Sequence, residues 1–315
     1  MMSGLMSYAA FFLVTALTYG IMSLGLNIQW GQTGLFNVGV AGFVAIGAYT
    51  SALLTTPFTP DRAAGFGLPI WIGWLGAMTV AAAAAAAIGA ITLRLRADYL
   101  AITTFGVAIV VELLALNLEH LTGGPFGIGF IPRPFESLEE RPLAFALANL
   151  ALVAIVTGVL FIGLERLVRS PWGRVLRAIR EDETAAASLG KNPNLYRLQA
   201  FILGSAVMAL AGAIQAHFIG FIAPDNYLPA LTFQVWAMLI VGGSGNNRGA
   251  LAGALVVWGF WSFTGALVSA LVPPEHQARA AALQIVAIGV LLAAILVVRP
   301  RGLFGEARAV SRFIE

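Results

Sequence analysis

The chain has 315 residues, of which 59% are hydrophobic and only 10% are charged. An average soluble domain is about 45–50% apolar and about 25% charged, so this composition excludes an ordinary soluble enzyme, a disordered protein and a fibrous protein. The chain contains no cysteine and three scattered histidines, which excludes a disulfide framework and a thiolate metal site and disfavours a zinc cluster. We therefore expect an all-α polytopic membrane protein.

Long apolar runs follow one another along the whole chain. A helix that crosses about 30 Å of hydrocarbon needs roughly 20 mostly apolar residues, and we expect about nine such segments, within a range of eight to ten. The segments 35–54 and 230–243 are rich in glycine or short, so they are candidates for broken or re-entrant helices. The expected segments are residues 7–29, 35–54, 70–93, 99–118, 146–166, 198–222, 230–243, 249–272 and 280–298.

The charged residues predict the orientation of the chain. Residues 166–197 contain seven Arg and Lys, and the C-terminal tail contains four Arg, whereas residues 119–145 contain two Arg against four acids. Positive residues accumulate on the cytoplasmic side of a membrane, and nine spans place 94–98, 166–197 and the tail together on that side. The C-terminus is then cytoplasmic and the N-terminus external. No Lys or Arg precedes the first segment, unlike a cleavable signal peptide, so we interpret it as a retained span.

A polar helix is expected in the basic loop, over residues 170–190. Ser170 is a candidate N-cap, Pro171 suits the first turn, and Gly190 marks the end. One interpretation is an interfacial helix whose arginines meet anionic lipid. The other is a helix that docks into a groove of a partner protein, favoured by the acidic run 181–183 and the small residues 185–187.

Within this loop, Glu183, Ala186 and Gly190 form a Glu-x-x-Ala-x-x-x-Gly pattern that resembles the coupling loop of ABC-importer permeases. The surrounding sequence resembles the permease family for branched-chain amino acids, its LivM-type subunits in particular. One departure is Asn246-Asn247, where family members commonly carry Gly-Thr. The stretches that carry the resemblance are residues 25–27, 32–39, 46–49, 93–106, 121–124, 211–213, 221–225, 242–245 and 299–304.

The resemblance implies a single transmembrane permease domain over residues 1–315, with a coupling loop at 166–197, in a bacterial cytoplasmic (inner) membrane. The implied partners are a second permease subunit, two ABC ATPase subunits, a periplasmic substrate-binding protein and the lipid bilayer, with no nucleic acid. The chain has no phosphate-loop motif, so it is expected to be a transport subunit rather than an enzyme. ATP and Mg²⁺ are then used by the partner subunits, and this chain binds no cofactor and no metal.

Three groups of residues are candidates for function. The first couples the chain to the ATPase, and the second provides polar groups at membrane depth, each of which could instead hydrogen-bond a neighbouring helix. The third comprises glycines that could break helices beside the pathway. The coupling residues are Arg174, Arg177, Arg180, Glu183, Ala186 and Gly190; the pathway residues are Asn27, Gln32, Asn37, Glu112, Asn117 and Gln234; the glycines are Gly31, Gly34, Gly39, Gly242, Gly243 and Gly245.

Other functions are open at this point. An ion-coupled secondary transporter is disfavoured because only Glu112 lies clearly within a predicted span, and an ABC permease for urea, short amides or sugars is a further alternative. The run Gly242-Gly243-Ser244-Gly245 matches the motif of intramembrane serine proteases. A nucleophilic serine needs a base within hydrogen-bond reach, and the last predicted span has no histidine, so a protease is disfavoured.

Overall fold

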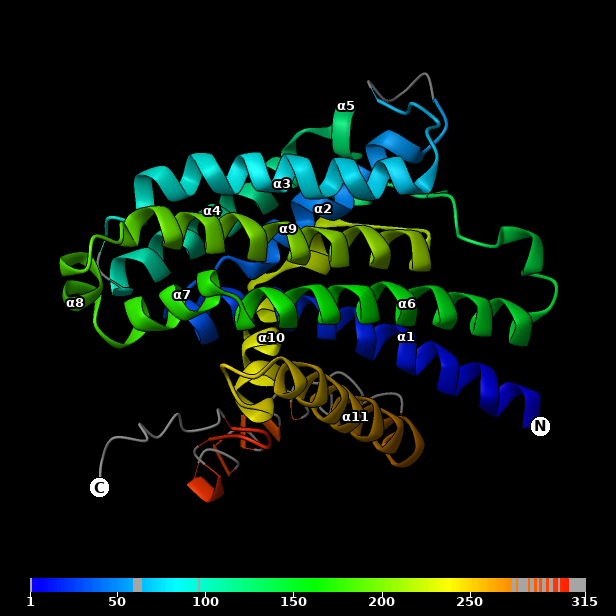
Figure 1. The fold of residues 1–315 in the computed structure, drawn as a ribbon. Helices are drawn as coiled ribbons and strands as arrows, with labels where there is room; N and C mark the ends of the chain where they lie inside the picture. Colours follow the sequence, from blue (N-terminus) through cyan, green and yellow to red (C-terminus); the bar gives the residue numbers. More distant parts are fainter. Residues whose placement is uncertain are drawn as a thin grey trace.

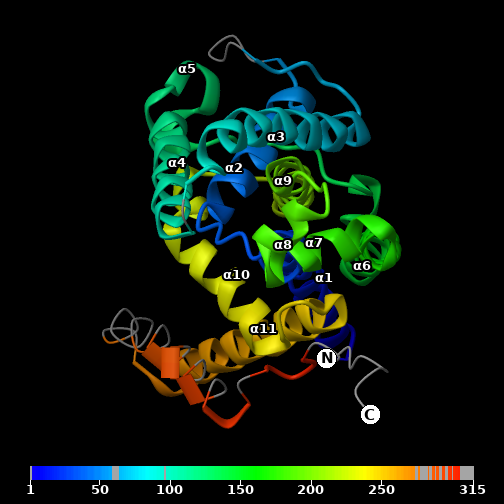
Figure 2. The same ribbon diagram turned by 60° about the vertical axis from the view of Figure 1, so that its left-hand side comes forward.

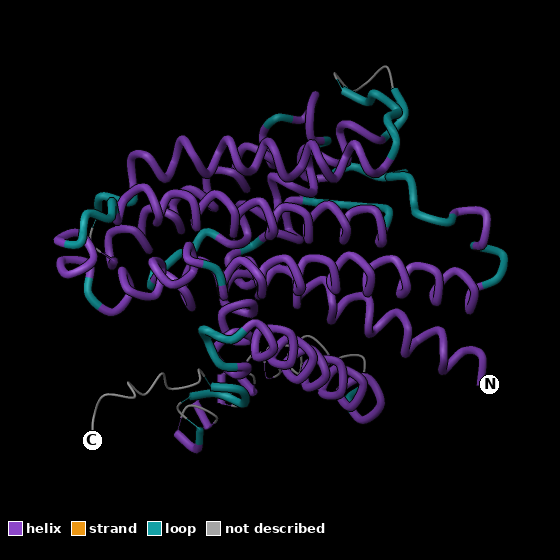
Figure 3. The backbone as a smooth tube through the Cα atoms, viewed as in Figure 1, coloured by secondary structure: helices purple, strands orange, loops and turns teal. Residues whose placement is uncertain are grey.

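The computed structural model is a helical bundle (Figure 1, Figure 3). It describes residues 2–58, 64–95, 97–273, 276, 283, 286–287, 289–290, 293–294, 297–299 and 301–305, and these residues contain no strand. The α-helices are α1 (Met2–Leu26), α2 (Val40–Thr55), α3 (Ile70–Thr92), α4 (Ala97–Asn117), α5 (Glu119–Thr122), α6 (Pro142–Arg169), α7 (Pro171–Glu181), α8 (Glu183–Ser188), α9 (Pro193–Ile219), α10 (Pro229–Gly242) and α11 (Asn247–Leu271). Short π and 3-10 turns are η1 (Asn27–Gly31), η2 (Gly124–Phe126), η3 (Glu136–Leu138) and η4 (Pro224–Tyr227).

Six of these helices are long and apolar enough to cross a bilayer, namely α1 with η1, α3, α4, α6, α9 and α11. The prediction of a polytopic helical membrane protein is thus confirmed. The helices α2 and α10 have 16 and 14 residues, which corresponds to about 24 and 21 Å, less than the thickness of the hydrocarbon core. The expected span at 280–298 lies mostly outside the described residues. The count of nine spans is therefore not confirmed.

The helix α9 lies at the centre of the bundle, with α1, α2, α3 and α6 around it (Figure 2). Glycine allows α2 and α9 to approach each other closely. A Cβ on Gly47 would lie 2.0 Å from the carbonyl oxygen of Ala209, and a Cβ on Gly212 would lie 2.1 Å from that of Val44. Small residues at crossings allow this backbone contact in membrane helices, where lipid provides no hydrophobic drive for association.

The two ends of the bundle differ in charge and in structure. One end carries α7, α8 and the turn between α3 and α4 (Figure 1); we call it the basic end. The N-terminus of α1 and the segment that precedes α6 lie at the opposite end. The predicted loops 94–98 and 166–197 thus share one end, as the charge distribution indicated.

Hydrogen bonds hold the opposite end together. Ile128 and Ile222 exchange backbone hydrogen bonds of 2.8 and 2.9 Å. The buried ring of His217 lies 2.8 Å (Nε2) from the Ser51 hydroxyl and 2.7 Å (Nδ1) from the Pro132 carbonyl oxygen. His217 therefore joins α2, α9 and the loop before α6, which is a structural role, and it does not pair with Ser244 as a protease base would.

The close α2–α9 crossing generates a prediction. Substituting Gly47→Ala places a methyl group against backbone, which cannot move aside cheaply, and such overpacking typically costs about 1–3 kcal/mol. We expect the thermal unfolding midpoint of the purified protein in detergent to fall, as followed by fluorescence-detected size exclusion. The matched control is Gly158→Ala on α6, where a Cβ would meet nothing within 4 Å. An unchanged midpoint for Gly47→Ala would contradict the crossing.

Candidate coupling site

The helix α7 lies across the basic end of the bundle with one apolar side turned inward. Leu176 and Ile179 are 0% and 2% exposed, as expected for residues three apart on one face of a helix. At its start, Gly173 packs so closely on α6 that a Cβ would lie 2.0 Å from the carbonyl oxygen of Val168. The helix is therefore seated against the membrane bundle and follows α6 directly.

Two of the predicted arginines of α7 bind the end of η1 and the residue that follows it. Arg177 Nη1 donates to Gln32 Oε1 at 3.2 Å and to the carbonyl oxygen of Val168 at 3.1 Å. Arg180 donates to the carbonyl oxygen of Gly31. Arg174 is exposed and donates to the carbonyl oxygen of Arg169 at 3.4 Å. Because Arg177 and Arg180 bind protein groups, the interpretation of α7 as a lipid-facing basic helix is not supported.

The predicted single helix over 170–190 is wrong, because the chain bends at Asp182. This residue is extended (φ −152°) and separates α7 from α8. Its carboxylate accepts a hydrogen bond of 2.9 Å from the backbone N–H of Ala185, so it is the N-cap of a new helix. At the other end of α7, Ser170 occupies the N-cap position and Pro171 begins the helix, as predicted, but the Ser170 hydroxyl donates to the carbonyl oxygen of Leu167 at 2.7 Å and makes no capping hydrogen bond.

The helix α8 is short and far less embedded than α7. Ala186 is 4% exposed, and Glu183 forms an ion pair of 2.8 Å with Arg197 on α9. Gly190 follows with a φ of +77°, a left-handed conformation that glycine adopts readily. Leu189 is 81% exposed. The tip of the coupling loop therefore presents a large apolar side chain outside the membrane bundle.

Beneath α7, a chain of hydrogen bonds runs through buried amides. Gln32 Nε2 donates to the carbonyl oxygen of Gly245 at 2.9 Å, and the N–H of Gly245 donates to Asn27 Oδ1 at 2.8 Å. Asn27 Nδ2 donates to Asn247 Oδ1 at 2.9 Å, and Asn247 Nδ2 donates to Glu165 Oε2 at 2.9 Å. We call the series from Arg177 through these residues to Glu165 the amide relay.

The amide relay ends on an ion pair. Glu165 and Arg169 lie one turn apart on α6, and their closest atoms are 2.6 Å apart. Asn27 and Gln32 are 0% exposed and Asn247 is 2% exposed. Five hydrogen bonds therefore connect α7 with the end of α1, the α10–α11 turn, the start of α11 and the end of α6.

A second buried cluster surrounds the break between α1 and α2. The helical chain continues through η1 to residue 33, and residues 34–39 are not helical, so the segment predicted from residue 35 begins later, at Val40. Asn37 Nδ2 donates to Gln29 Oε1 at 2.7 Å. Gln29 Nε2 donates in turn to the carbonyl oxygen of Phe201 at 2.9 Å and to the Ser205 hydroxyl at 3.1 Å.

The predicted glycines lie at or near the two breaks. Gly34, with a φ of +71°, and Gly39 bound the first break, whereas Gly31 lies within the π turn. The second break is the turn between α10 and α11. Gly242 ends α10, and Gly243 and Gly245 lie in the turn.

The other three predicted pathway residues lie apart from both clusters. Glu112 is partly exposed on α4, and no described residue forms a hydrogen bond or ion pair with it. Asn117 is exposed, and its Nδ2 donates to the carbonyl oxygen of Leu113 in its own helix at 2.7 Å. Gln234 on α10 has a buried Nε2 without a hydrogen-bond partner among the described residues. Their role in a pathway stays a prediction.

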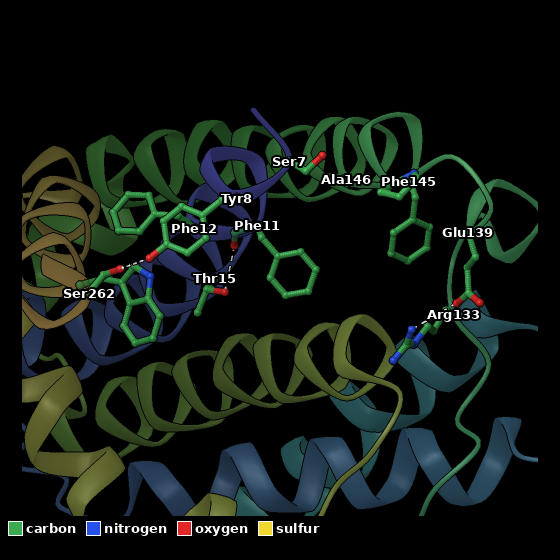
Figure 4. A pocket seen from close by; sticks show the side chains of 12 residues that line it. Ser7, Tyr8, Phe11, Phe12, Thr15, Arg133, Glu139, Phe145, Ala146 and Ser262 are labelled. Atoms are coloured by element: carbon green, nitrogen blue, oxygen red, sulfur yellow. Dashed lines mark hydrogen bonds and ion pairs between the residues drawn. The ribbon is translucent and has the colours of Figure 1, made fainter. Parts of the chain in front are cut away.

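A cavity of about 560 Å³ opens at the opposite end, among α1, α6 and α11. Phe11 and Phe145 point into it, and the Arg133–Glu139 ion pair of 3.2 Å lies on one side (Figure 4). Arg133 is also bound to the carbonyl oxygen of Ile219 at 2.6 Å. The predicted pathway residues do not line this cavity.

Comparison with known proteins identifies the family. The model of the branched-chain amino acid transport system permease component matches residues 8–297. The chain belongs to this family. The predicted resemblance is therefore confirmed, and membership in a family of transport permeases agrees with a transport subunit rather than an enzyme.

Individual relatives are similar over most of the chain. The LivM permease protein of Escherichia coli is 36% identical over 76% of this chain, and the match spans 59% of LivM, so the chain covers about three fifths of that relative. The LivH permease protein of the same organism is 25% identical over 92% of both chains. A guanosine ABC transporter permease protein of Bacillus subtilis is 28% identical over 84% of this chain and 76% of its own length. No solved structure matches.

The bend at Asp182 generates a prediction. Removing its carboxylate with Asp182→Ala takes away the acceptor of the Ala185 N–H, and loss of an N-cap typically costs about 1 kcal/mol. We expect amide hydrogen exchange of residues 183–190 to accelerate about fivefold, while exchange in α7 stays unchanged. The control Asp182→Asn keeps an acceptor oxygen, so the amide hydrogens of residues 183–190 should exchange at the wild-type rate. Equal exchange in all three proteins would contradict the capping role.

Proposed function

We propose that this chain is a membrane-spanning permease subunit of an ATP-driven ABC importer that carries branched-chain or related small amino acids. The observation that carries the proposal is the divided coupling loop. Its first helix, α7, is fastened to the membrane bundle by Arg177 and Arg180, whereas its second helix, α8, presents exposed Leu189. Such a loop can bind a partner with α8 and pass the partner's movement to the membrane helices through α7.

The proposed assembly has this chain paired with a second permease subunit, two ABC ATPase subunits at the basic end and a substrate-binding protein at the opposite end. ATP and Mg²⁺ are bound by the ATPase subunits. Arg174, Glu183 and Gly190 complete the proposed coupling surface, whereas Ala186, which is 4% exposed, packs α8 against its own chain. The similarity to both LivM and LivH permease proteins supports a pair of related permeases. In this proposal residues 1–315 form one permease domain, which contains the coupling loop 166–197.

The proposed orientation places the basic end in the cytoplasm of a bacterial cell, in agreement with the positive-inside rule. The tail belongs to the same end, because Leu303 N–H and Phe304 N–H donate to the carbonyl oxygens of Val241 and Gly242, each at 2.9 Å. The C-terminus would then be cytoplasmic and the N-terminus of α1 external.

The proposed pathway lies at the surface of this chain, where it meets the second permease. Asn27, Gln32 and Asn37 are fully buried and occupied by hydrogen bonds within the chain, so they act as structural supports of the pathway rather than as its lining. Glu112 and Gln234 have no such partners among the described residues and are the stronger candidates to face substrate. Isolated polar groups at membrane depth are costly and commonly functional.

The test is reconstitution of the tagged chain with its candidate ATPase subunits, second permease and binding protein in liposomes. We expect ATP-dependent uptake of radiolabelled leucine that an excess of unlabelled isoleucine or valine abolishes. If guanosine abolishes the uptake and isoleucine and valine do not, nucleosides would replace amino acids as the proposed substrate class. Uptake that needs an ion gradient and not ATP would contradict the importer and favour a secondary transporter.

The exposed tip of α8 generates a prediction. The substitution Leu189→Glu should reduce co-purification of the ATPase subunits at least fivefold, because it places a carboxylate in an interface expected to be apolar and desolvated. The control Leu189→Met keeps an apolar side chain and should retain the ATPase. Because Leu189 touches little of its own chain, the thermal unfolding midpoint of the isolated permease should stay unchanged. Full ATPase recovery with Leu189→Glu would contradict docking at this tip.

A further inference from the structure

The amide relay has a consistent direction. Arg177 donates to Gln32, Gln32 to Gly245, Gly245 to Asn27, Asn27 to Asn247, and Asn247 to Glu165. Every donor therefore points the same way, from a guanidinium on α7 to a carboxylate on α6. Hydrogen bonds aligned in series polarise one another and strengthen cooperatively in a low-dielectric interior. Gly245 accepts on the carbonyl of one peptide unit and donates from the N–H of the preceding one, so the relay consists of two aligned runs of hydrogen bonds that the Gly245 backbone joins.

Asn247 is the residue through which the amide relay passes from Asn27 to Glu165, and we call it the junction. Its Oδ1 accepts from Asn27 at the end of α1, and its Nδ2 donates to Glu165 on α6. It is 2% exposed and is the first residue of α11. An amide side chain can accept on one atom and donate on the other, so a carboxylate at this position would keep the bond to Asn27 and lose the bond to Glu165.

The first residue of the relay also binds the helix at which the relay ends. Arg177 donates to the carbonyl oxygen of Val168 on α6 as well as to Gln32. Val168 lies one turn after Glu165, so the hydrogen bonds close a ring through α7, the end of α1, the α10–α11 turn, α11 and α6. Within this ring, a tilt of α7 relative to α6 stretches the bond from Arg177 to Val168 or to Gln32.

We infer that Asn247 is a positioning residue that transmits movement of α7 to the start of α11, through the continuous hydrogen-bond series between Arg177 and Glu165. This inference rests on the proposed function, because the movement of α7 is driven by ATPase subunits. Glu165 holds the far end of the series, and its ion pair with Arg169 anchors that carboxylate on α6. Neither Asn247 nor Glu165 contacts substrate in this role.

The test compares a disrupted and a repaired junction in the reconstituted transporter. The substitution Asn247→Asp sets two carboxylates against each other and breaks the last link. Adding Glu165→Gln restores a hydrogen bond between the two positions, now donated from residue 165, and leaves a single negative charge in it. Because the contact between α11 and α6 is restored, uptake by the double variant should recover. The control is Asn226→Asp at the opposite end, an exposed residue whose Oδ1 accepts from Ala223 N–H at 2.9 Å, a bond that Asp keeps.

We expect Asn247→Asp to lower ATP-driven leucine uptake at least tenfold while ATP hydrolysis and ATPase recovery stay within twofold of wild type. The double variant should return uptake to within threefold, and Asn226→Asp should be unchanged. Uptake within twofold of wild type for Asn247→Asp would overturn the inference. A double variant no better than the single one would also overturn it, since the junction would then act only through packing.

A distance measurement reads the transmission directly. The chain has no cysteine, so Ala178→Cys on α7 and Arg248→Cys on α11, both exposed, can carry spin labels attached before assembly. With wild-type Asn247, we expect the 178–248 distance to stay constant when ATP is added, because the two helices move together. With Asn247→Asp, the distance should change with ATP. A distance that responds to ATP equally in both proteins would overturn the inference.

Two further results keep the inference separate from the proposed function. If Asn247→Asp fails to insert, Asn247→Ser removes both amide bonds without adding charge and should show the same loss of uptake with ATP hydrolysis retained; normal uptake would overturn the inference alone. If the wild-type chain neither recovers ATPase subunits nor transports with ATP, the proposed function fails and the inference falls with it. If the wild-type chain transports normally and the Asn247 variants also show normal uptake, the inference is overturned and the proposed function stands.

Discussion

The structure depends on one constraint, which is that a chain broken inside a membrane bundle must pair its freed backbone groups within the protein. Lipid offers no hydrogen bonds, and each unpaired group costs several kcal/mol. At the break between α1 and α2, the N–H of Val38 donates to Thr104 on α4 at 3.0 Å, and the N–H of Ala41 donates to Thr232 on α10 at 3.0 Å. Trp236 on α10 donates to the carbonyl oxygen of Asn37 at 2.9 Å. The hydrogen bonds that pair the backbone groups at this break therefore hold α4 and α10 beside it.

The coupling site follows from the same constraint applied at the second break. The turn between α10 and α11 lies beside the end of α1, so its backbone is paired by Asn27 and Gln32. The arginines of α7 then bind the remaining acceptors of that region, Gln32 Oε1 and the Gly31 carbonyl oxygen. The helix α7 is therefore attached to an irregular part of the bundle, where η1 and the α10–α11 turn meet.

Much of the architecture could be predicted from the sequence, because apolar length and the distribution of arginine act locally. Helices such as α3 and α4 begin and end within two residues of the expected bounds. The bend at Asp182 was missed because residues 170–190 carry a continuous helical pattern, and only the capping bond of Asp182 shows that a second helix begins. Glu165 and Asn247 were missed because their importance arises from partners 82 residues apart along the chain. The available signal was Glu165 itself, an acidic residue one turn before Arg169 and inside the predicted membrane span 146–166.

The unequal attachment of α7 and α8 has an evolutionary consequence. Most of the side chains that hold α7 also support the membrane bundle, so changes there disturb the permease itself. The helix α8 is joined to the bundle chiefly through Ala186 and the Glu183–Arg197 ion pair, and its outer residues are free to vary without cost to folding. If α8 docks the ATPase as proposed, substitutions on α8 would alter the choice of ATPase subunit, while the hydrogen bonds that attach α7 to the bundle would be kept.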